Sequence, residues 1–272
     1  MAKLKATKGY FSNGLPYARF GNGSRNFVII NGLDLLHKPP SGLQLRMVIN
    51  TYKCFTEDYT VYLVNRKSRM PGGYSVRDAS DDYATMISDE LGVAVDIMGV
   101  SAGGAIAQYL AVDHSELVHH LVLTATAYRM SDEAKDLMIR VRDLARQGKG
   151  RAVCTTMMGS IYTHGVKKYL FKVLMWLFPS FMFDPTTGPS DGVGEIEAAL
   201  NHDFKDRLSN IKVPTLVVGG NQDFFCPEAL IRETADTIPN AKLILYQGLG
   251  HEAALSKQLA NDVLAFLTEG NT

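Results

Sequence analysis

The sequence predicts an α/β fold with a mostly parallel sheet, and three observations support this. Six short runs rich in β-branched and aliphatic residues recur along the chain, and amphipathic segments of helical length separate most of them. Such alternation is typical of parallel strands joined by crossover helices. The third observation is size, because 272 residues with 46% hydrophobic content can bury one large core.

The elements can be placed in order along the chain. Turn residues at Asn13-Gly14 and Gly21-Asn22-Gly23 predict an N-terminal hairpin, because they supply positive φ angles. The expected strands that follow span 27–30, 61–64, 95–98, 121–123, 214–218 and 243–245. The expected helices, bounded by Gly, Pro, Ser or Asp, span 42–56, 78–91, 102–113, 227–238 and 253–268.

The interval 128–206 interrupts this rhythm. It has helical patterns without a strand and is rich in Met and aromatic residues. We interpret it as a helical cap inserted into a core made of residues 1–127 and 207–272. Most of its apolar residues should pack the cap onto the core, because apolar helix faces usually build core. A minority is expected to line a substrate pocket together with a core loop: Met157, Met158, Tyr162 and Trp176, with Phe224.

Composition excludes several classes of function. Lys plus Arg and Asp plus Glu number 28 each, so no net charge draws nucleic acid or an anionic membrane to the protein. The first residues lack the apolar run of a signal peptide, and no stretch is long and apolar enough to span a bilayer, so we expect a cytoplasmic protein. Its oligomeric state is left open.

No cofactor or metal ion is expected. The chain contains no GxxxxGK[ST] or HExxH motif and no convincing GxGxxG motif. Cys54, Cys154 and Cys226 lack CxxC spacing, and an odd, sparse count fits reduced thiols better than disulfides or a zinc site.

A serine motif follows the third of these strands. Gly99-Val100-Ser101-Ala102-Gly103 lies between the apolar run 95–98 and the helical pattern 102–113, giving strand, sharp turn and helix. A nucleophile elbow needs this spacing, because glycine two residues to either side avoids a clash around a strained serine. The helix N-terminus also favours negative charge that develops there. Ser101 is therefore the predicted nucleophile.

Serine requires a general base and an acid that orients it. The run Gly219 to Asp223 follows the strand 214–218, and Gly248-Leu249-Gly250-His251 follows the strand 243–245. Both side chains should reach the carboxyl edge of the sheet, where sites of open α/β sheets collect. We therefore predict Asp223 as the acid and His251 as the base, in the order Ser, Asp, His that the elbow requires. Asp132, early in the cap, is the alternative acid.

The other six histidines are predicted to have surface or structural roles. His119 and His120 begin a strand and so lie at the wrong edge of the sheet. His114 lies near a helix end, and the remaining three, at positions 37, 164 and 202, have no acid in the required order.

An oxyanion needs two amide donors, one after the nucleophile and one after an early strand. The candidates are the backbone N–H groups of Ala102 and Leu33, the latter following Asn31-Gly32.

Taken together, these motifs resemble the α/β-hydrolase superfamily over the length of the chain. The matching pieces include Asn31-Gly32-Leu33, Asn65-Arg66 with Pro71 to Ser75, the serine elbow, and the segments that end in Asp223 and His251. The chain is similar to esterases and cofactor-free haloperoxidase-like hydrolases with a helical cap. Many relatives have His-Gly where this chain has Asn31-Gly32. The resemblance implies a mostly parallel eight-stranded sheet flanked by helices.

The resemblance also implies an acyl-enzyme hydrolase. A serine in the elbow argues against haloalkane dehalogenase and epoxide hydrolase chemistry, which in this fold uses a carboxylate nucleophile. We therefore expect a carboxylic-ester hydrolase acting on small or medium apolar esters. A carbon–carbon bond hydrolase, a lactonase and a perhydrolase use the same residues and remain alternatives. A receptor for small molecules that has kept this fold is a further alternative, although an intact Ser, Asp and His set counts against it.

Overall fold

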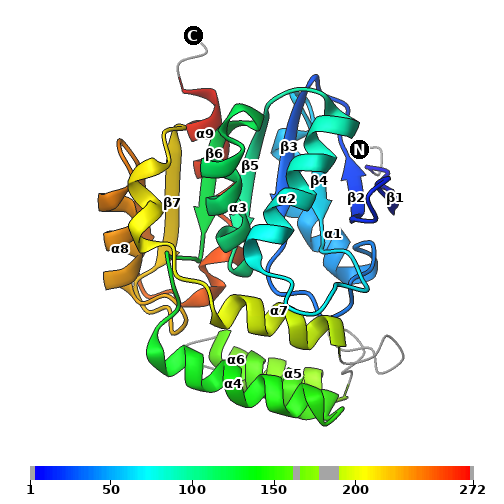
Figure 1. The fold of residues 1–272 in the computed structure, drawn as a ribbon, viewed down its shortest axis with the longest axis vertical. Helices are drawn as coiled ribbons and strands as arrows, with labels where there is room; N and C mark the ends of the chain where they lie inside the picture. Colours follow the sequence, from blue (N-terminus) through cyan, green and yellow to red (C-terminus); the bar gives the residue numbers. More distant parts are fainter. Residues whose placement is uncertain (1–3, 162–165, 178–189, 270–272) are drawn as a thin grey trace.

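The structure is a computed structural model that describes residues 4–161, 166–177 and 190–269. Its centre is an eight-stranded sheet in the order β1-β2-β4-β3-β5-β6-β7-β8 (Figure 1). The strands are β1 (Thr7–Tyr10), β2 (Pro16–Phe20), β3 (Arg25–Ile30), β4 (Tyr59–Val64), β5 (Val95–Val100), β6 (Val118–Thr124), β7 (Thr215–Gly220) and β8 (Lys242–Tyr246). The predicted fold class is confirmed.

All pairs from β4 to β8 are parallel, whereas β1 and β2 form an antiparallel hairpin that joins the sheet through β4. Gly14 adopts φ +89° in the hairpin turn. The parallel strands place their carboxyl ends at one edge of the sheet. Loops after β3, β5, β7 and β8 therefore meet there, and these loops contain the residues selected from the sequence.

Helices cover both faces of the sheet. Successive residues of a strand point to opposite faces, so Val28 and Ile30 pack with α2 (Val76–Met86), α3 (Ala102–Asp113) and α8 (Glu228–Thr237). Phe27 and Ile29 face the other side, where α9 (Leu259–Thr268) and residues around α1 (Gly42–Thr51) complete a second core. Because both faces are covered, the parallel strands are apolar along almost their whole length.

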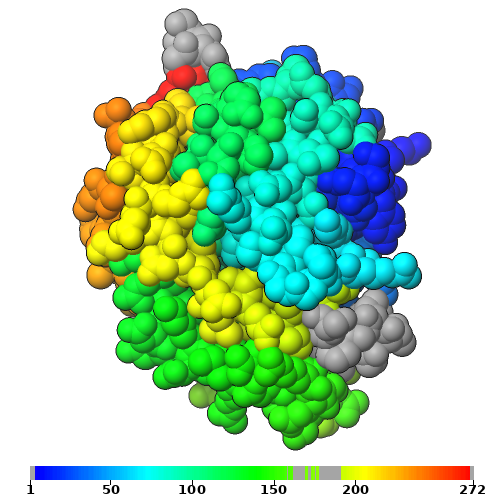
Figure 2. Space-filling view, viewed as in Figure 1, coloured from blue at the N-terminus to red at the C-terminus, as the bar shows by residue number. Residues whose placement is uncertain are grey.

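In the described residues, four α-helices lie between β6 and β7 and cover the carboxyl edge of the sheet (Figure 1). They are α4 (Asp132–Arg146), α5 (Gly150–Ile161), α6 (Val166–Leu177) and α7 (Ser190–Leu200). A small core formed by α4, α5 and α7 includes Leu35 from the loop after β3. In the space-filling view α7 lies between α4 and the core domain (Figure 2). The cap is thus placed over the ends of the strands.

Two predicted helices are interrupted in the structure. The prediction 42–56 is divided into α1 and a 3-10 turn, η1 (Lys53–Phe55), and the prediction 253–268 is divided into a 3-10 helix, η6 (His251–Leu255), and α9. Ser256 separates the last two with an extended backbone, ψ 138°. The sequence predicted one continuous helix here because apolar residues recur at helical spacing on both sides of the break. The break lets η6 follow the loop that places His251, while α9 packs on the sheet.

One predicted helix also begins earlier than expected. α2 starts at Val76 rather than at 78, because Ser75 and Asp78 form a capping box at its N-terminus. A π-helical segment, Ile87–Leu91, extends it to the predicted end. Among the residues that the structure describes, no helix is long and apolar enough to cross a membrane.

Candidate active site

Ser101 stands on a strained turn between β5 and α3. Its backbone has φ 53° and ψ −121°, a conformation that residues other than glycine rarely adopt. Two backbone hydrogen bonds hold the turn, since Ser101 N–H donates to the Thr124 carbonyl at 2.9 Å and its own carbonyl accepts from Gly104 N–H at 2.8 Å. Backbone strain of this kind persists only where surrounding contacts fix the conformation, and it is concentrated at functional sites.

The two glycines of the motif are required by different neighbours. A Cβ at Gly99 would lie 2.6 Å from the Gly103 carbonyl oxygen, within the elbow itself. A Cβ at Gly103 would lie 2.2 Å from the carbonyl oxygen of Ile30, because α3 begins directly against the end of β3. The first clash was predicted from the motif. The second depends on the packing of α3 against β3 and is visible only in the structure.

Ser101, His251 and Asp223 form one hydrogen-bonded line. His251 Nε2 lies 2.9 Å from Ser101 Oγ, and His251 Nδ1 lies 2.8 Å from Asp223 Oδ2. The other oxygen of Asp223 accepts the backbone N–H groups of Phe225 at 2.8 Å and Cys226 at 3.0 Å. The Asp223 side chain is fully buried. The carboxylate is therefore held at both ends, and its position determines that of the imidazole.

The loops after β7 and β8 are tied to each other. Gln222 N–H donates to the Leu249 carbonyl, and the Asn221 side chain both donates to Gln247 and accepts from Gly248 N–H. A Cβ at Gly220 would lie 2.2 Å from the Leu249 carbonyl oxygen. Close approach of the two loops thus needs glycine at the end of β7, and it brings residues 28 positions apart into contact.

The two predicted backbone donors lie beside this line. Leu33 and Ala102 line the same cavity as Ser101 and His251. Within the described residues, neither N–H donates to a backbone carbonyl or to a side chain, although Asp34 N–H, one residue on, donates to Glu195. Ala102 is also the first residue of α3, where helix N–H groups have no partner within the helix. Both N–H groups are thus free to bind a ligand oxygen.

The cavity next to Ser101 has a volume of about 250 Å³ and is mostly apolar. Its floor is the loop after β3 and the start of α3, and its roof is the cap. The described cap and loop residues that line it include Met130, Met138, Met157, Ile161, Ala199 and Phe225. The ring of Phe225 also packs on the His251 ring, with centroids 4.8 Å apart. An apolar group bound here would lie directly above the serine.

Only some of the predicted pocket residues line this cavity. Met157 lines it, whereas Trp176 is 56% exposed and contacts Arg151 on the surface of the cap. Phe224 is not among the lining residues, because its neighbour Phe225 faces the cavity. The side chain of Met158 and the whole of Tyr162 lie outside the described residues. Apolar composition therefore indicated the correct segment but could not show which side of each helix faces the cavity.

The sequence also missed several lining residues. Met130 and Met138 belong to the start of the cap, and the prediction had concentrated on its middle. Phe225 faces the cavity because Asp223 accepts its N–H and the chain turns there, which only the structure shows. Asp132, the alternative acid, is exposed and pairs with Arg129 at 3.1 Å.

The cysteines offer no competing nucleophile. Burial raises the pKa of Cys154 to about 11 and raises the pKa of Cys226 well above its usual value. Cys54 is exposed, and desolvation raises its pKa as well. A thiol of raised pKa is mostly protonated at neutral pH and is a poor nucleophile.

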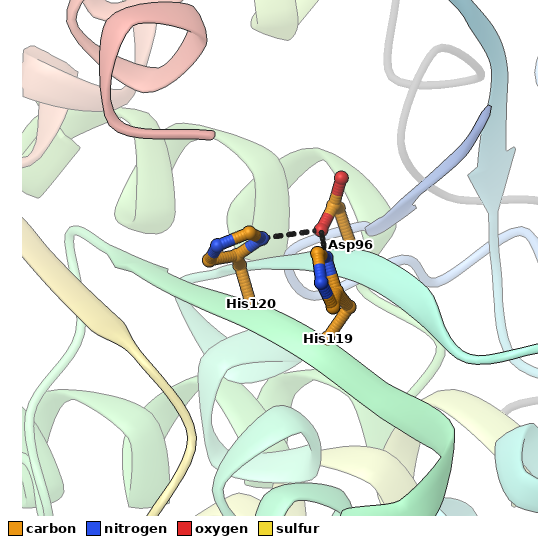
Figure 3. Close-up of side chains that lie close together, drawn as sticks. All are labelled: Asp96, His119 and His120. Atoms are coloured by element: carbon orange, nitrogen blue, oxygen red, sulfur yellow. Dashed lines mark hydrogen bonds and ion pairs between the residues drawn. The ribbon is translucent and has the colours of Figure 1, made fainter. Parts of the chain in front are cut away.

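A second cluster of titratable groups, Asp96, His119 and His120, lies near the starts of β5 and β6, at the edge opposite to Ser101. Figure 3 shows how the three side chains meet. His119 Nδ1 and His120 Nδ1 lie 3.1 and 2.7 Å from Asp96 Oδ1, and these atoms are close enough to share a metal ion. Arg25 pairs with Asp96 Oδ2 at 3.0 Å. Burial alone would raise the pKa of Asp96, but hydrogen bonds from His120 and His119 and the charge of Arg25 hold it below its usual value. Both oxygens already have partners, so the cluster links β5 to β6.

Adjacent residues of a strand normally point to opposite faces, yet His119 and His120 reach the same carboxylate oxygen. A register shift explains this, because Val95 pairs with Val118 and Asp96 pairs with His120, leaving His119 as an extra residue. A bulge of this kind re-aims a side chain. This role agrees with the prediction that both histidines are structural and lie far from Ser101 along β5 and β6.

Comparison with known proteins agrees with this architecture. Residues 64–258 match the family described as alpha/beta hydrolase fold. A curated relative is the pimeloyl-[acyl-carrier protein] methyl ester esterase of Nitrosomonas europaea, which is 26% identical over 202 residues that cover 69% of this chain and 77% of the relative.

Two solved structures are similar in fold. MGS-M2, an alpha/beta hydrolase enzyme from a Medee basin deep-sea metagenome library, has a TM-score of 0.80 at 20% identity and covers 94% of each chain. The enol-lactonase from Burkholderia xenovorans LB400 has a TM-score of 0.79 at 19% identity, covering 97% of this chain and 100% of its own. At these identities the likeness concerns the fold.

Proposed function

Because this chain belongs to the alpha/beta hydrolase fold family, we propose that it is a serine hydrolase that cleaves carboxylic esters through an acyl-enzyme on Ser101. One observation carries the proposal. Ser101 Oγ is hydrogen-bonded through His251 to the buried Asp223, and Ser101 lines an apolar cavity. Leu33 and Ala102, whose N–H groups are free in the described structure, line the same cavity. Nucleophile, base, orienting acid and oxyanion donors are the parts that acyl transfer requires.

In the proposed reaction, Ser101 Oγ attacks the ester carbonyl carbon while His251 Nε2 takes the hydroxyl proton. The carbonyl oxygen becomes an oxyanion that the N–H groups of Leu33 and Ala102 stabilise. His251 then gives the proton to the leaving alcohol as the carbon–oxygen bond breaks, and the acyl group stays on Ser101. A water molecule, deprotonated by His251, then attacks the acyl carbon. The bond from this carbon to Ser101 Oγ breaks, His251 returns the proton to Oγ, and the acid is released.

The cavity supports small or medium apolar acyl or alcohol groups as the substrate class. Its lining is mostly aliphatic side chains and methionine, and the charged side chain at its margin, Arg129, is paired with Asp132. Each buried methylene contributes about 0.8 kcal/mol to binding. The curated relative acts, by its name, on a methyl ester, which agrees with this class.

The proposal is tested by labelling and turnover. Incubation with a p-nitrophenyl phosphonate ester should add the phosphonyl mass to the peptide that contains Ser101, because only an activated hydroxyl attacks this electrophile rapidly. A panel of p-nitrophenyl esters of graded acyl length then measures turnover, with Ser101→Ala as the control. Label on another residue, or hydrolysis by Ser101→Ala above background, would contradict the proposal.

A lactonase is the second candidate, and one observation favours it. A lactone is a cyclic ester that the same groups would open, and the enol-lactonase of similar fold aligns over its whole length. Adding five- and six-membered lactones to the ester panel separates the two, since a lactonase prefers them by kcat/KM. Labelling of Ser101 with tight product retention and almost no turnover would instead favour a receptor.

A further inference from the structure

The side chain of Arg66 lies almost fully buried just beyond the end of β4, against the loop that follows β3. It is 2% exposed, and its Nη1 donates to the carbonyl oxygens of Asn31 at 2.7 Å and Gly32 at 2.6 Å. The peptide unit that contains the Gly32 carbonyl also contains the N–H of Leu33. In a trans peptide the C=O and N–H bonds point in opposite directions within one plane. The bond from Arg66 to Gly32 therefore determines where the Leu33 N–H points.

Arg66 is itself held by the cap. Its Nη2 lies 2.5 Å from Glu195 Oε1 on α7, and Glu195 is 6% exposed. The same carboxylate oxygen accepts Asp34 N–H at 3.4 Å, so it contacts the loop after β3 directly as well. An uncompensated charge in such a buried site is strongly unfavourable. Arg66 and Glu195 therefore hold each other in place, one from the core domain and one from the cap.

A second carboxylate of α7 faces the same side. Asp191 accepts the backbone N–H groups of Arg69 at 2.7 Å and Met70 at 3.0 Å. Asp191 and Glu195 are four residues apart, so they share one face of the helix. This face of α7 is thus attached to the chain that follows β4, and Ala199, four residues after Glu195 on α7, lines the cavity above Ser101.

We propose that Arg66 and Glu195 are positioning residues that aim the Leu33 N–H at the oxyanion and make this aim depend on the docking of α7. The inference rests on the proposed function, because the N–H matters only if Ser101 attacks an acyl group. If α7 moves away from the core, Glu195 leaves with it and Arg66 loses the partner that holds it against Gly32. The oxyanion site is then complete only when the cap is seated.

The charges of Arg66 and Glu195 stabilise each other in this buried cluster. Burial raises the pKa of Glu195 to about 7, and the positive charge of Arg66 opposes this rise. Asp34, His37 and the buried Tyr83 are titratable groups near the pair, with His37 Nε2 at 3.6 Å from Glu195 Oε2. Burial raises the pKa of Asp34 and lowers the pKa of His37. Arg66 is therefore the principal cation that stabilises the Glu195 carboxylate.

The test replaces both partners at once. Arg66→Met/Glu195→Met removes both charges of the pair together, and such replacements of buried ion pairs are often tolerated. We expect kcat for an aryl ester to fall by about 10- to 100-fold with KM within about twofold, since loss of a whole oxyanion donor costs about 10²- to 10³-fold. Glu197→Gln, on the same helix but in an exposed pair with Arg146, is the matched control and should keep parental kcat.

Two further measurements separate positioning from general stability. A trifluoromethyl ketone binds Ser101 as a tetrahedral oxyanion, so its inhibition constant should rise by the same factor as kcat falls. A crystal structure of the double variant should show the Gly32–Leu33 peptide turned. A folded double variant with parental kcat, or with this peptide unchanged, would overturn the inference. If the parent hydrolyses no ester, the proposed function fails, while the peptide orientation still decides the inference.

A variant that keeps the charge covers the case in which the double variant does not fold. Arg66→Lys retains a cation opposite Glu195, but an ammonium group cannot span two carbonyls and a carboxylate as the planar guanidinium does. We expect it to lower kcat by about 3- to 10-fold at unchanged KM, which is a fraction of the loss of one donor. Parental kcat in Arg66→Lys would overturn the inference in that case.

Discussion

At the scale of single residues, the geometry of the site is set by the hydrogen bonds that individual side chains make. Asp223 uses one oxygen for His251 and the other for two backbone N–H groups of the following turn. The order of Ser101, Asp223 and His251 along the chain, each after a strand, was enough to select them. The step from Phe224 to Phe225 was not predictable, because adjacent loop residues have similar chemistry and only the turn after Asp223 shows which ring faces the cavity.

We predict that Asp223→Asn folds and loses turnover by about 10⁴-fold, by analogy with serine-protease triads. The asparagine oxygen can keep the bonds from Phe225 and Cys226, which leaves its amide N–H₂ facing His251. The imidazole must then accept at Nδ1 and carry its proton on Nε2, so it cannot take the proton of Ser101. Steady-state kinetics measure the loss, and thermal denaturation checks the fold. Activity within tenfold of the parent would remove Asp223 from this role.

At the scale of elements, the cap shows what periodicity cannot determine. The segment 128–206 was predicted to lack strands and to overlie the core, and its described parts contain helices and no strand. Helices α4, α5 and α7 bury apolar residues against one another and also contribute residues to the lining of the cavity. The sequence consequently could not separate Met157, which faces the cavity, from Trp176, which faces solvent.

This difference leads to a prediction about acyl-chain preference. Met157→Ala should enlarge the cavity and raise kcat/KM for longer acyl esters relative to short ones, by about fourfold for each extra methylene accommodated, from about 0.8 kcal/mol per methylene. Trp176→Ala is the matched control in the same cap and should keep the parental ranking. The graded ester panel measures both. Equal shifts in the two variants, or none in Met157→Ala, would show that Met157 only packs the cap.

At the scale of the whole molecule, buried titratable groups make stability depend on pH although the net charge is zero. His202 is buried against Tyr109 and Phe204, and in the described structure neither ring nitrogen has a hydrogen-bond partner. Burial lowers the pKa of His202 from 6.5 to about 4. The unfolded chain therefore binds more protons than the folded chain between these values, so stability is lost as pH falls through this range.

We predict that His202→Phe loses less stability on acidification than the parent. Between pH 7 and pH 5 the His202 contribution to the free energy of unfolding should fall by about 2 kcal/mol, from about 1.4 kcal/mol per pKa unit. Phenylalanine keeps the aromatic contacts and removes the titration. Urea denaturation at both pH values measures the difference, with His114→Gln at a more exposed position as control. Parallel pH dependences of parent and His202→Phe would mean that His202 does not titrate in this way.

The sequence by itself determined the order of strands and helices, the strained serine between β5 and α3, and the chain order of the three side chains that line up in the site. These features are local, or follow from the rule that parallel strands end at one edge. Tertiary structure alone decided which glycines are needed for contact between distant segments, such as Gly103 against Ile30 and Gly220 against Leu249. It also decided that Arg66 and Glu195, 129 positions apart, meet behind the loop that contains Leu33. Local patterns contain no information about such pairs, because the cap is anchored by contacts between residues far apart in the chain.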